Sequence, residues 1–260
     1  MSTLSTDSIN KVASVGIIFW IIKMMSTTVG ETGADFLIFK LHWGLVITSL
    51  VMLLPLVAVL AFQIYVRSYH HGLYWSAVVL VSIVGTLITD LLTDYVNVPL
   101  PVSSFFFSVV LLSILVLWFK QEKTLSIKTI NTKRREGFYW AAILITFALG
   151  TAVGDWVSEY LNLGYKIGIF LFGGMIVLVA IAHYKLRMQA VISFWMAYIL
   201  TRPLGASVGD YLSHSKHKGG LGFGTVNTSL IFLVVIFILV ILLIYIDQSN
   251  SKDSRKLKNE

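Results

Sequence analysis

The sequence predicts an all-α integral membrane protein with eight transmembrane helices, built as four parallel helix-hairpin repeats in two tandem halves. Two observations lead to this fold class. Of the 260 residues, 57% are hydrophobic and only 13% are charged, so a soluble fold of this length could not hide the apolar surface. In addition, a pattern of Trp, Gly and Asp recurs four times at fixed spacing.

A transmembrane helix needs about 20 apolar residues, and the chain supplies a series of such runs. The spans are expected at 12–38, 43–66, 74–96, 101–119, 138–160, 165–184, 189–212 and 224–246. Because they use most of the chain, no room is left for a large soluble catalytic domain, and we expect no enzyme. The first ten residues contain no basic segment of the kind that opens a cleaved signal peptide, so the first span is expected to be retained.

The loops between the spans divide the basic residues unevenly. Of the 20 Lys and Arg, fourteen fall on the side of the N-terminus, four fall on the other side, and Lys23 and Arg202 lie within spans. By the positive-inside rule, both termini are cytoplasmic in a multi-pass protein of the inner (cytoplasmic) membrane. The expected parts are a cytoplasmic N-terminus (1–11), a first half (12–130), a second half (131–246) and a polar, disordered cytoplasmic tail (247–260).

Composition also limits the partners. The net charge of +7 is explained by this topology, so no nucleic acid is expected. The chain has no Cys, which excludes disulfides, thiolate metal sites and cysteine nucleophiles. The expected partners are the lipid bilayer and a transported ion or small molecule, and a homo-oligomer is compatible with the sequence. No covalent cofactor is expected, and a divalent cation is the bound group that the acidic residues suggest.

The repeat is marked by an aromatic residue followed by Trp, at 19–20, 74–75, 139–140 and 194–195. A Gly lies ten residues after each Trp and an Asp fifteen residues after it, positions written +10 and +15 below. The two halves are offset by 120 residues, and each unit holds two spans. Two spans return the chain to its starting side, so all four Trp-bearing motif helices must point the same way. The repeats are then related by an axis along the membrane normal, and a ring or a two-plus-two packing is expected.

The repeat glycines have a packing role. Positions +10 and +14 hold the pairs Gly30/Ala34, Gly85/Thr89, Gly150/Gly154 and Gly205/Gly209. Small residues at this spacing let helix backbones approach closely in lipid, so we expect the motif helices to pack on one another or on their partner helices. The Trp side chains are expected largely at membrane interfaces.

Positions +7, +11, +15 and +19 share one face of each motif helix and form a polar stripe. The polar members are Thr27, Glu31 and Asp35; Ser82, Thr86, Asp90 and Asp94; Thr151, Asp155 and Glu159; and Arg202, Asp210 and His214. Ionisable groups inside a membrane usually face the bundle interior and mark functional sites. The four stripes can therefore converge, with Asp94 and Glu159 close enough to the outer surface to be solvated. The repeated Asp can instead cap helix ends or join repeats by hydrogen bonds.

Two cations lie among these carboxylates. An Arg at the depth of Arg202 either binds an anionic substrate or pairs with Glu31 or Asp155 across the bundle, and pairing is favoured. Pro203 removes a helix hydrogen bond, so a kink or break is expected there. Lys23 either faces the interior or extends to the membrane surface.

The acids outnumber these cations. Glu31 and the four repeated Asp make five acids, so the excess carboxylates must be protonated, hydrated or bound to a cation. These are the states that a proton-coupled cation transporter needs. The remaining ionisable pairs, His70 with His71 and His214 with His217, can bind metal but are more typical of an interface.

The stretches FWIIKMMSTTVGETGADFL, YWAAILITFALGTAVGDWVSEYL and FWMAYILTRPLGASVGDYLSH resemble the repeats of a bacterial family of uncharacterised membrane-anchored proteins. That family is built from a repeat of unassigned function, so the resemblance implies a fold and a bacterial origin but no activity. The pairs Gly30-Glu31, Gly154-Asp155 and Gly209-Asp210 are also distantly similar to acidic repeat motifs of cation exchangers for calcium and manganese. Those exchangers use inverted repeats, whereas the repeats here are expected to be parallel.

The favoured function is proton-coupled export of a hard divalent cation, Mn²⁺ or Mg²⁺, through a central acidic site, because oxygen ligands suit these ions. The groups expected to bind cations or protons are Glu31, Asp35, Asp90, Asp155 and Asp210, with the four Asp as metal ligands. Thr86 and Thr151 would complete the shell, and Arg202 would set the resting charge. The alternatives are a transporter of an organic or anionic substrate held by Arg202, and a non-transporting membrane scaffold joined by the Asp residues.

Overall fold

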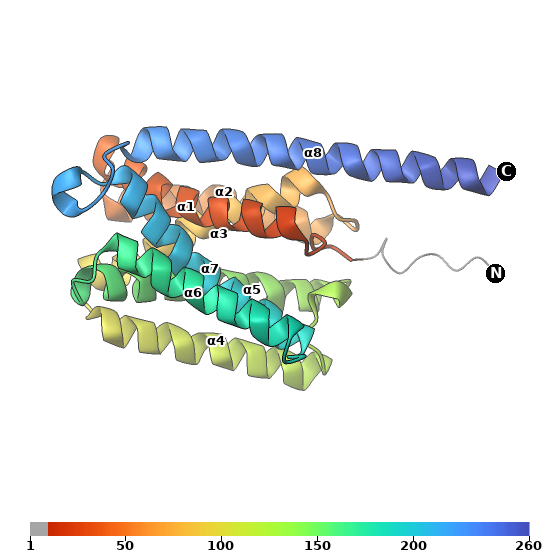
Figure 1. Cartoon of the computed structure of the whole chain (residues 1–260), viewed down its shortest axis with the longest axis horizontal. Coiled ribbons are helices and arrows are strands. Elements are labelled where there is room, and N and C mark those ends of the chain that lie inside the picture. Colours follow the sequence, from red (N-terminus) through yellow and green to blue (C-terminus); the bar gives the residue numbers. More distant parts are fainter. Residues whose placement is uncertain (1–9, 260) are drawn as a thin grey trace.

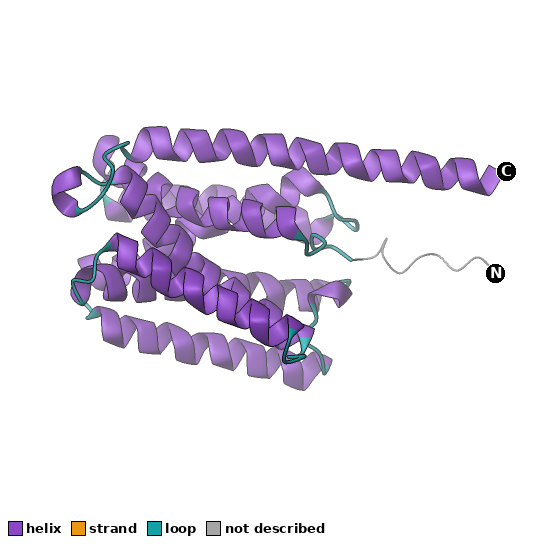
Figure 2. Cartoon of the chain, in the orientation of Figure 1, coloured by secondary structure: helices purple, strands orange, loops and turns teal. Residues whose placement is uncertain are grey.

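A computed structural model describes residues 10–259, with side chains over 10–249, and contains eight α-helices and no β-strand in that range (Figure 2). The helices are α1 (Ile17–Asp35), α2 (Leu45–Tyr65), α3 (His71–Asp90), α4 (Leu100–Glu122), α5 (Lys133–Asp155), α6 (Tyr165–Tyr184), α7 (Ala190–Ser213) and α8 (Thr225–Asn259). Each predicted span therefore corresponds to a helix, with ends shifted by several residues.

Seven of these helices, α2 to α8, are long and apolar enough to cross a membrane, which indicates a multi-pass membrane protein. The sequence analysis expected eight, and the helix that falls short is α1. Its polar side chains, among them Lys23 and Glu31, lower its mean hydropathy. They are tolerated because α1 is enclosed by α3, α7 and α8.

The four motif helices form a closed inner ring. Helix α1 contacts α3, α3 contacts α5, α5 contacts α7, and α7 returns to α1. The other helices lie outside this ring, where α2 packs on α3, α4 on α5, α6 on α7 and α8 on α1. Each outer helix thus covers the motif helix of the next unit, and the last unit closes onto the first.

The motif helices all run in the same direction, as the repeat predicted. In Figure 1 helix α1 begins and α8 ends at the same end of the bundle, on the right. We call this end the Trp end, since the four aromatic-Trp pairs begin the motif helices there, and the opposite end the Asp end. The helices of Trp20 and Trp140 are parallel, so equivalent helices of the two halves take equivalent places in the ring.

The repeat glycines set the register of the ring. A methyl group added at any of the four would overlap the +7 side chain of the next unit: Ser82 at Gly30, Phe147 at Gly85, Arg202 at Gly150 and Thr27 at Gly205. The predicted close helix packing is confirmed, and it is the motif helices themselves that approach one another. Because the same contact recurs in all four interfaces, residues at the same repeat position lie at the same level of the ring.

We expect Gly85→Ala to destabilise the protein by about 1–3 kcal/mol, because the added methyl would lie 2.5 Å from Cβ of Phe147 and 3.2 Å from the Ala148 amide nitrogen. Gly174→Ala in α6 is the matched control, since its added methyl meets no atom within 4 Å. Thermal unfolding of both variants in detergent measures the difference. Equal melting temperatures would contradict the packing role of Gly85.

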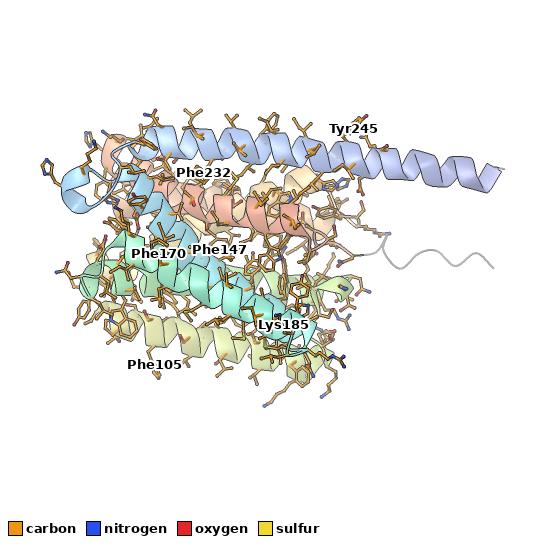
Figure 3. The ribbon with its side chains drawn as sticks, viewed as in Figure 1. Phe105, Phe147, Phe170, Lys185, Phe232 and Tyr245 are labelled. Carbon is orange, nitrogen blue, oxygen red and sulfur yellow. The ribbon has the colours of Figure 1, made fainter. Side chains whose placement is uncertain are left out.

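Apolar side chains cover the outside of the bundle. Phe105, Phe170 and Tyr245 on the outer helices are 72%, 79% and 70% exposed. Phe147, by contrast, lies inside the ring and is fully buried (Figure 3). So much exposed apolar surface is unsuited to water and is what a lipid-facing surface requires.

The chain ends differ from the prediction. Helix α8 continues to Asn259, so the expectation of a disordered tail over 247–260 is wrong as far as residue 259. Of the predicted N-terminal part, residues 1–9 lie outside the described residues. Lys11, the last residue of the expected N-terminal part (1–11), is buried and forms an ion pair with the buried Glu136. Its Nζ also donates to the Ile64 carbonyl oxygen at 3.2 Å, which fixes this segment against the Trp end.

Candidate functional site

The polar stripes converge inside the ring in successive layers. From the Trp end to the Asp end, the layers are +3 (Lys23, Val78, Ile143, Tyr198), +7 (Thr27, Ser82, Phe147, Arg202), +11 (Glu31, Thr86, Thr151, Ala206) and +15 (Asp35, Asp90, Asp155, Asp210). All residues of the +3, +7 and +11 layers are buried. At +15, Asp210 is buried and the other three Asp are half-buried. The interior is therefore closed to solvent on the Trp side of the aspartates and becomes accessible at the Asp end.

Arg202 lies at the centre of the ring and is fully buried. Its Nη2 donates to Glu31 Oε2 at 2.9 Å, to Thr151 Oγ1 at 2.7 Å and to Thr86 Oγ1. Its Nη1 donates to the Thr27 carbonyl oxygen at 2.8 Å. One side chain of unit four thus binds all three other units. The predicted pairing of Arg202 with Glu31 is confirmed.

The four repeated aspartates form the outermost polar layer. Asp35, Asp90 and Asp155 each end the α-helical part of a motif helix, and π-helical segments follow at Phe36–Lys40, Leu91–Tyr95 and Trp156–Tyr160. Asp210 differs, since α7 stays α-helical through Ser213. Within the described residues, none of the four carboxylates accepts a hydrogen bond from a neighbouring helix. They are therefore not acting as helix caps.

Two groups of three side chains lie close enough to share one cation. In the inner group, carboxylate oxygens of Glu31, Asp155 and Asp210 lie within 4.8 Å of one another. In the outer group, Asp35 and Asp210 lie within the same distance of a ring nitrogen of His214. Asp210 belongs to both groups. Asp90 occupies the same layer but belongs to neither, so the four predicted metal ligands do not form one cluster.

Lys23 faces the interior and does not extend to the surface. It is fully buried, its Nζ donates to the Tyr198 carbonyl oxygen at 3.3 Å, and it lies 4.3 Å from the Tyr198 ring centroid and 4.6 Å from that of Phe147. Aromatic faces attract a cation in this way. Lys23 thus lies on the Trp side of Arg202, in the layer furthest from the aspartates.

Of the kink or break expected at Pro203, the break is absent, because α7 is continuous from Ala190 to Ser213. Pro203 packs against Gly150 and Gly154 of α5, where the missing side chains leave room for its ring. Neighbouring helices commonly make a proline tolerable inside a membrane helix.

The remaining ionisable residues are distributed as follows. Asp94 and Glu159 are exposed, as expected. His71 contacts Asp247, with Nε2 and Oδ2 3.2 Å apart, and His217 is exposed. Only His214 of the four histidines singled out joins the acidic layer.

The closure of the Trp end was not predicted. Phe19, Tyr74, Tyr139 and Phe194, the residues before each repeat Trp, are buried together, and the hydroxyls of Tyr74 and Tyr139 lie 2.6 Å apart. Trp75, Trp140 and Trp195 are also buried, so these three pack inside the bundle and not on its surface. The aromatic pairs were recognised as repeat markers, and their recurrence on one helix face was the signal for this role.

The fold and the interior define an all-helical protein of four two-helix repeats, with seven membrane-length apolar helices around a polar core. The chain belongs to the family described as Repeat of Unknown Function (DUF347), whose model matches residues 18–69, 73–124, 138–189 and 193–249. Each match covers one motif helix and the outer helix after it, as the spacing predicted. Neither the curated proteins nor the solved structures contain a match to the chain.

Proposed function

We propose that the protein is a multi-pass transporter of the inner membrane that exports a hard divalent cation, Mn²⁺ or Mg²⁺, coupled to protons. The observation that carries this proposal is the charge inside the ring. Arg202 is paired with Glu31, and no ion pair with a Lys or Arg reaches the four aspartates in the described residues. Uncompensated carboxylates at such a site are costly unless they are protonated, hydrated or bound to a cation, which are the states that a proton-coupled cation transporter uses.

The topology supports a one-sided entrance. With α1 counted as an eighth span, enclosed by its neighbours, the distribution of Lys and Arg favours a cytoplasmic Trp end and an external Asp end. The aromatic layers would then seal the cytoplasmic side, and the aspartates would meet the external solution. Export requires a second state in which the Trp end opens.

The alternative of an anionic substrate on Arg202 receives less support. Its Nη1 and Nη2 donate to Thr27, Glu31, Thr86 and Thr151, and its Nε lies 3.4 Å from the Phe147 carbonyl oxygen. An anion would have to displace these partners.

The scaffold alternative is weakened by the hydrogen bonds that join the repeats. Thr28 Oγ1 donates to the Gly205 carbonyl oxygen at 3.0 Å, and Thr89 Oγ1 donates to that of Ala148 at 2.8 Å. Threonines thus connect neighbouring motif helices, while the aspartates make no such bond in the described residues. The aspartates are free for another role.

We expect the purified protein to move Mn²⁺ or Mg²⁺ across liposome membranes and Asp155→Asn to reduce the flux by at least about tenfold. The substitution keeps the size of the side chain and removes the charge from the inner group. Asp94→Asn is the control, since Asp94 is exposed and belongs to neither group. Native flux by the Asp155→Asn protein would overturn the proposed site.

A further inference from the structure

We infer that Asp35, Asp210 and His214 form an outer binding site that prefers a first-row transition-metal cation such as Mn²⁺ over Mg²⁺. The inference rests on the proposed function and names its substrate class more narrowly. The three side chains come from the ends of α1 and α7, which are neighbours in the ring. One atom from each lies within 4.8 Å of the other two, a spacing that small side-chain movements would close around one ion.

The imidazole of His214 is held in place by its surroundings. His214 follows the last residue of α7, and its Nδ1 lies 3.2 Å from the Asp210 carbonyl oxygen and 3.7 Å from Asp210 Oδ1. The ring stacks on Tyr165 of α6, with centroids 5.2 Å apart and planes inclined by 25°. The Tyr165 hydroxyl in turn donates to Glu159 Oε1 at 3.2 Å. Such outer contacts orient metal-binding imidazoles and support their affinity.

Asp210 provides an independent indication of a ligand. The residue is only 4% exposed, and its carboxylate accepts no hydrogen bond from the described residues. A buried carboxylate without a hydrogen-bond donor is costly unless something else satisfies it. Its Oδ1 lies 3.7 Å from Nδ1 of His214, with which it shares the outer group. A bound cation would satisfy both side chains at once.

Unit four is built differently from the others at this point. In the first three units the π-helical segment after the repeated Asp widens the turn, and position +19 (Phe39, Asp94 and Glu159) is exposed. Helix α7 keeps α-helical geometry through Ser213, so His214 at +19 lies one turn beyond Asp210 on the same face. The departure from the repeat therefore brings the histidine to the acidic layer.

The ligand set decides the metal class. Two carboxylates and one imidazole suit Mn²⁺ and related first-row cations. Mg²⁺ prefers oxygen ligands and keeps several waters, so it gains little from an imidazole. The inner group of Glu31, Asp155 and Asp210 contains only oxygen ligands. Since Asp210 belongs to both groups, a cation could pass from one to the other without leaving this ligand.

The test is metal binding by the purified full-length protein in detergent, titrated separately with Mn²⁺ and Mg²⁺. We expect His214→Ala to weaken Mn²⁺ binding by about 10- to 100-fold and to change Mg²⁺ binding little. His217→Ala is the matched control, since His217 is exposed three residues away and should change neither affinity. In the native protein, bound Mn²⁺ should show magnetic coupling to a ¹⁴N nucleus, and His214→Ala should abolish it.

Native Mn²⁺ affinity in a His214→Ala protein that elutes as native on gel filtration would overturn the outer site. Absence of the nitrogen coupling in the native protein would overturn it without any variant. The proposed transport fails separately: if the liposomes show no flux while His214-dependent Mn²⁺ binding persists, the site stands and the transport proposal falls. If flux is present but neither binding nor coupling depends on His214, the outer site falls and the transport proposal stands.

Discussion

Arg202→Ala is expected to cost about 3–5 kcal/mol of stability and to reduce the folded yield sharply. The substitution removes hydrogen bonds to all three other motif helices and leaves Glu31 buried without its partner. Loss of the long side chain also opens a void against Gly150. Folded yield and thermal unfolding in detergent measure the effect.

Arg134→Ala is the control for this prediction, since the Arg134 side chain is 64% exposed and its partner Glu122 keeps a second ion pair with Arg135. Removing it should change stability little. The double variant Arg202→Ala/Glu31→Ala should recover part of the loss, because it no longer buries an unpaired carboxylate. If Arg202→Ala unfolds at the same temperature as Arg134→Ala, the central network does not hold the ring together.

Asp210→Asn is expected to abolish cation flux while leaving a folded protein. Asp210 is the one residue shared by the inner and the outer group, so removing its charge weakens both. The Asn amide fits the same space and can still hydrogen-bond. We expect flux in liposomes to fall by more than about tenfold, with native elution on gel filtration.

Asp210→Leu separates this interpretation from a structural one. A transport site predicts that Asn and Leu both stop flux, with stability changed little by Asn. A scaffold that depends on Asp210 predicts modest loss for Asn and strong destabilisation for Leu. A folded Asp210→Asn protein with native flux would remove Asp210 from the transport site.

The ring could be predicted because its register is encoded by fixed spacing. The recurrence of Gly at +10 and Asp at +15 indicated parallel motif helices. In the structure each +10 glycine contacts the +7 side chain of the next unit, which aligns equivalent residues at the same level of the ring. The depth and burial of Arg202 followed from its place in the middle of a span. The cost of burying it unpaired then predicted a carboxylate partner, which is Glu31.

What the sequence could not predict are the differences between equivalent positions. Four Asp share one repeat position, yet Asp210 belongs to two groups and Asp90 to none. These differences depend on π-helical segments and side-chain directions that the spacing does not encode. The ion pair of Lys11 and Glu136 was missed because the two residues are distant in sequence and lie just outside the predicted spans 12–38 and 138–160. The spacing of the repeat gives no partner for residues outside it.

The order in which the outer helices cover the ring has a consequence for synthesis of the chain. Helix α1 is synthesised before the other seven and is the one that falls short of a membrane-length apolar helix, yet the helix that covers it, α8, is synthesised after all the others described. The early units therefore cannot mature one at a time, as the units of a stacked linear repeat can. Until α7 has been made, Lys23 and Glu31 lack their neighbours from that helix, so the nascent ring must persist as an open arc that α7 and α8 later close.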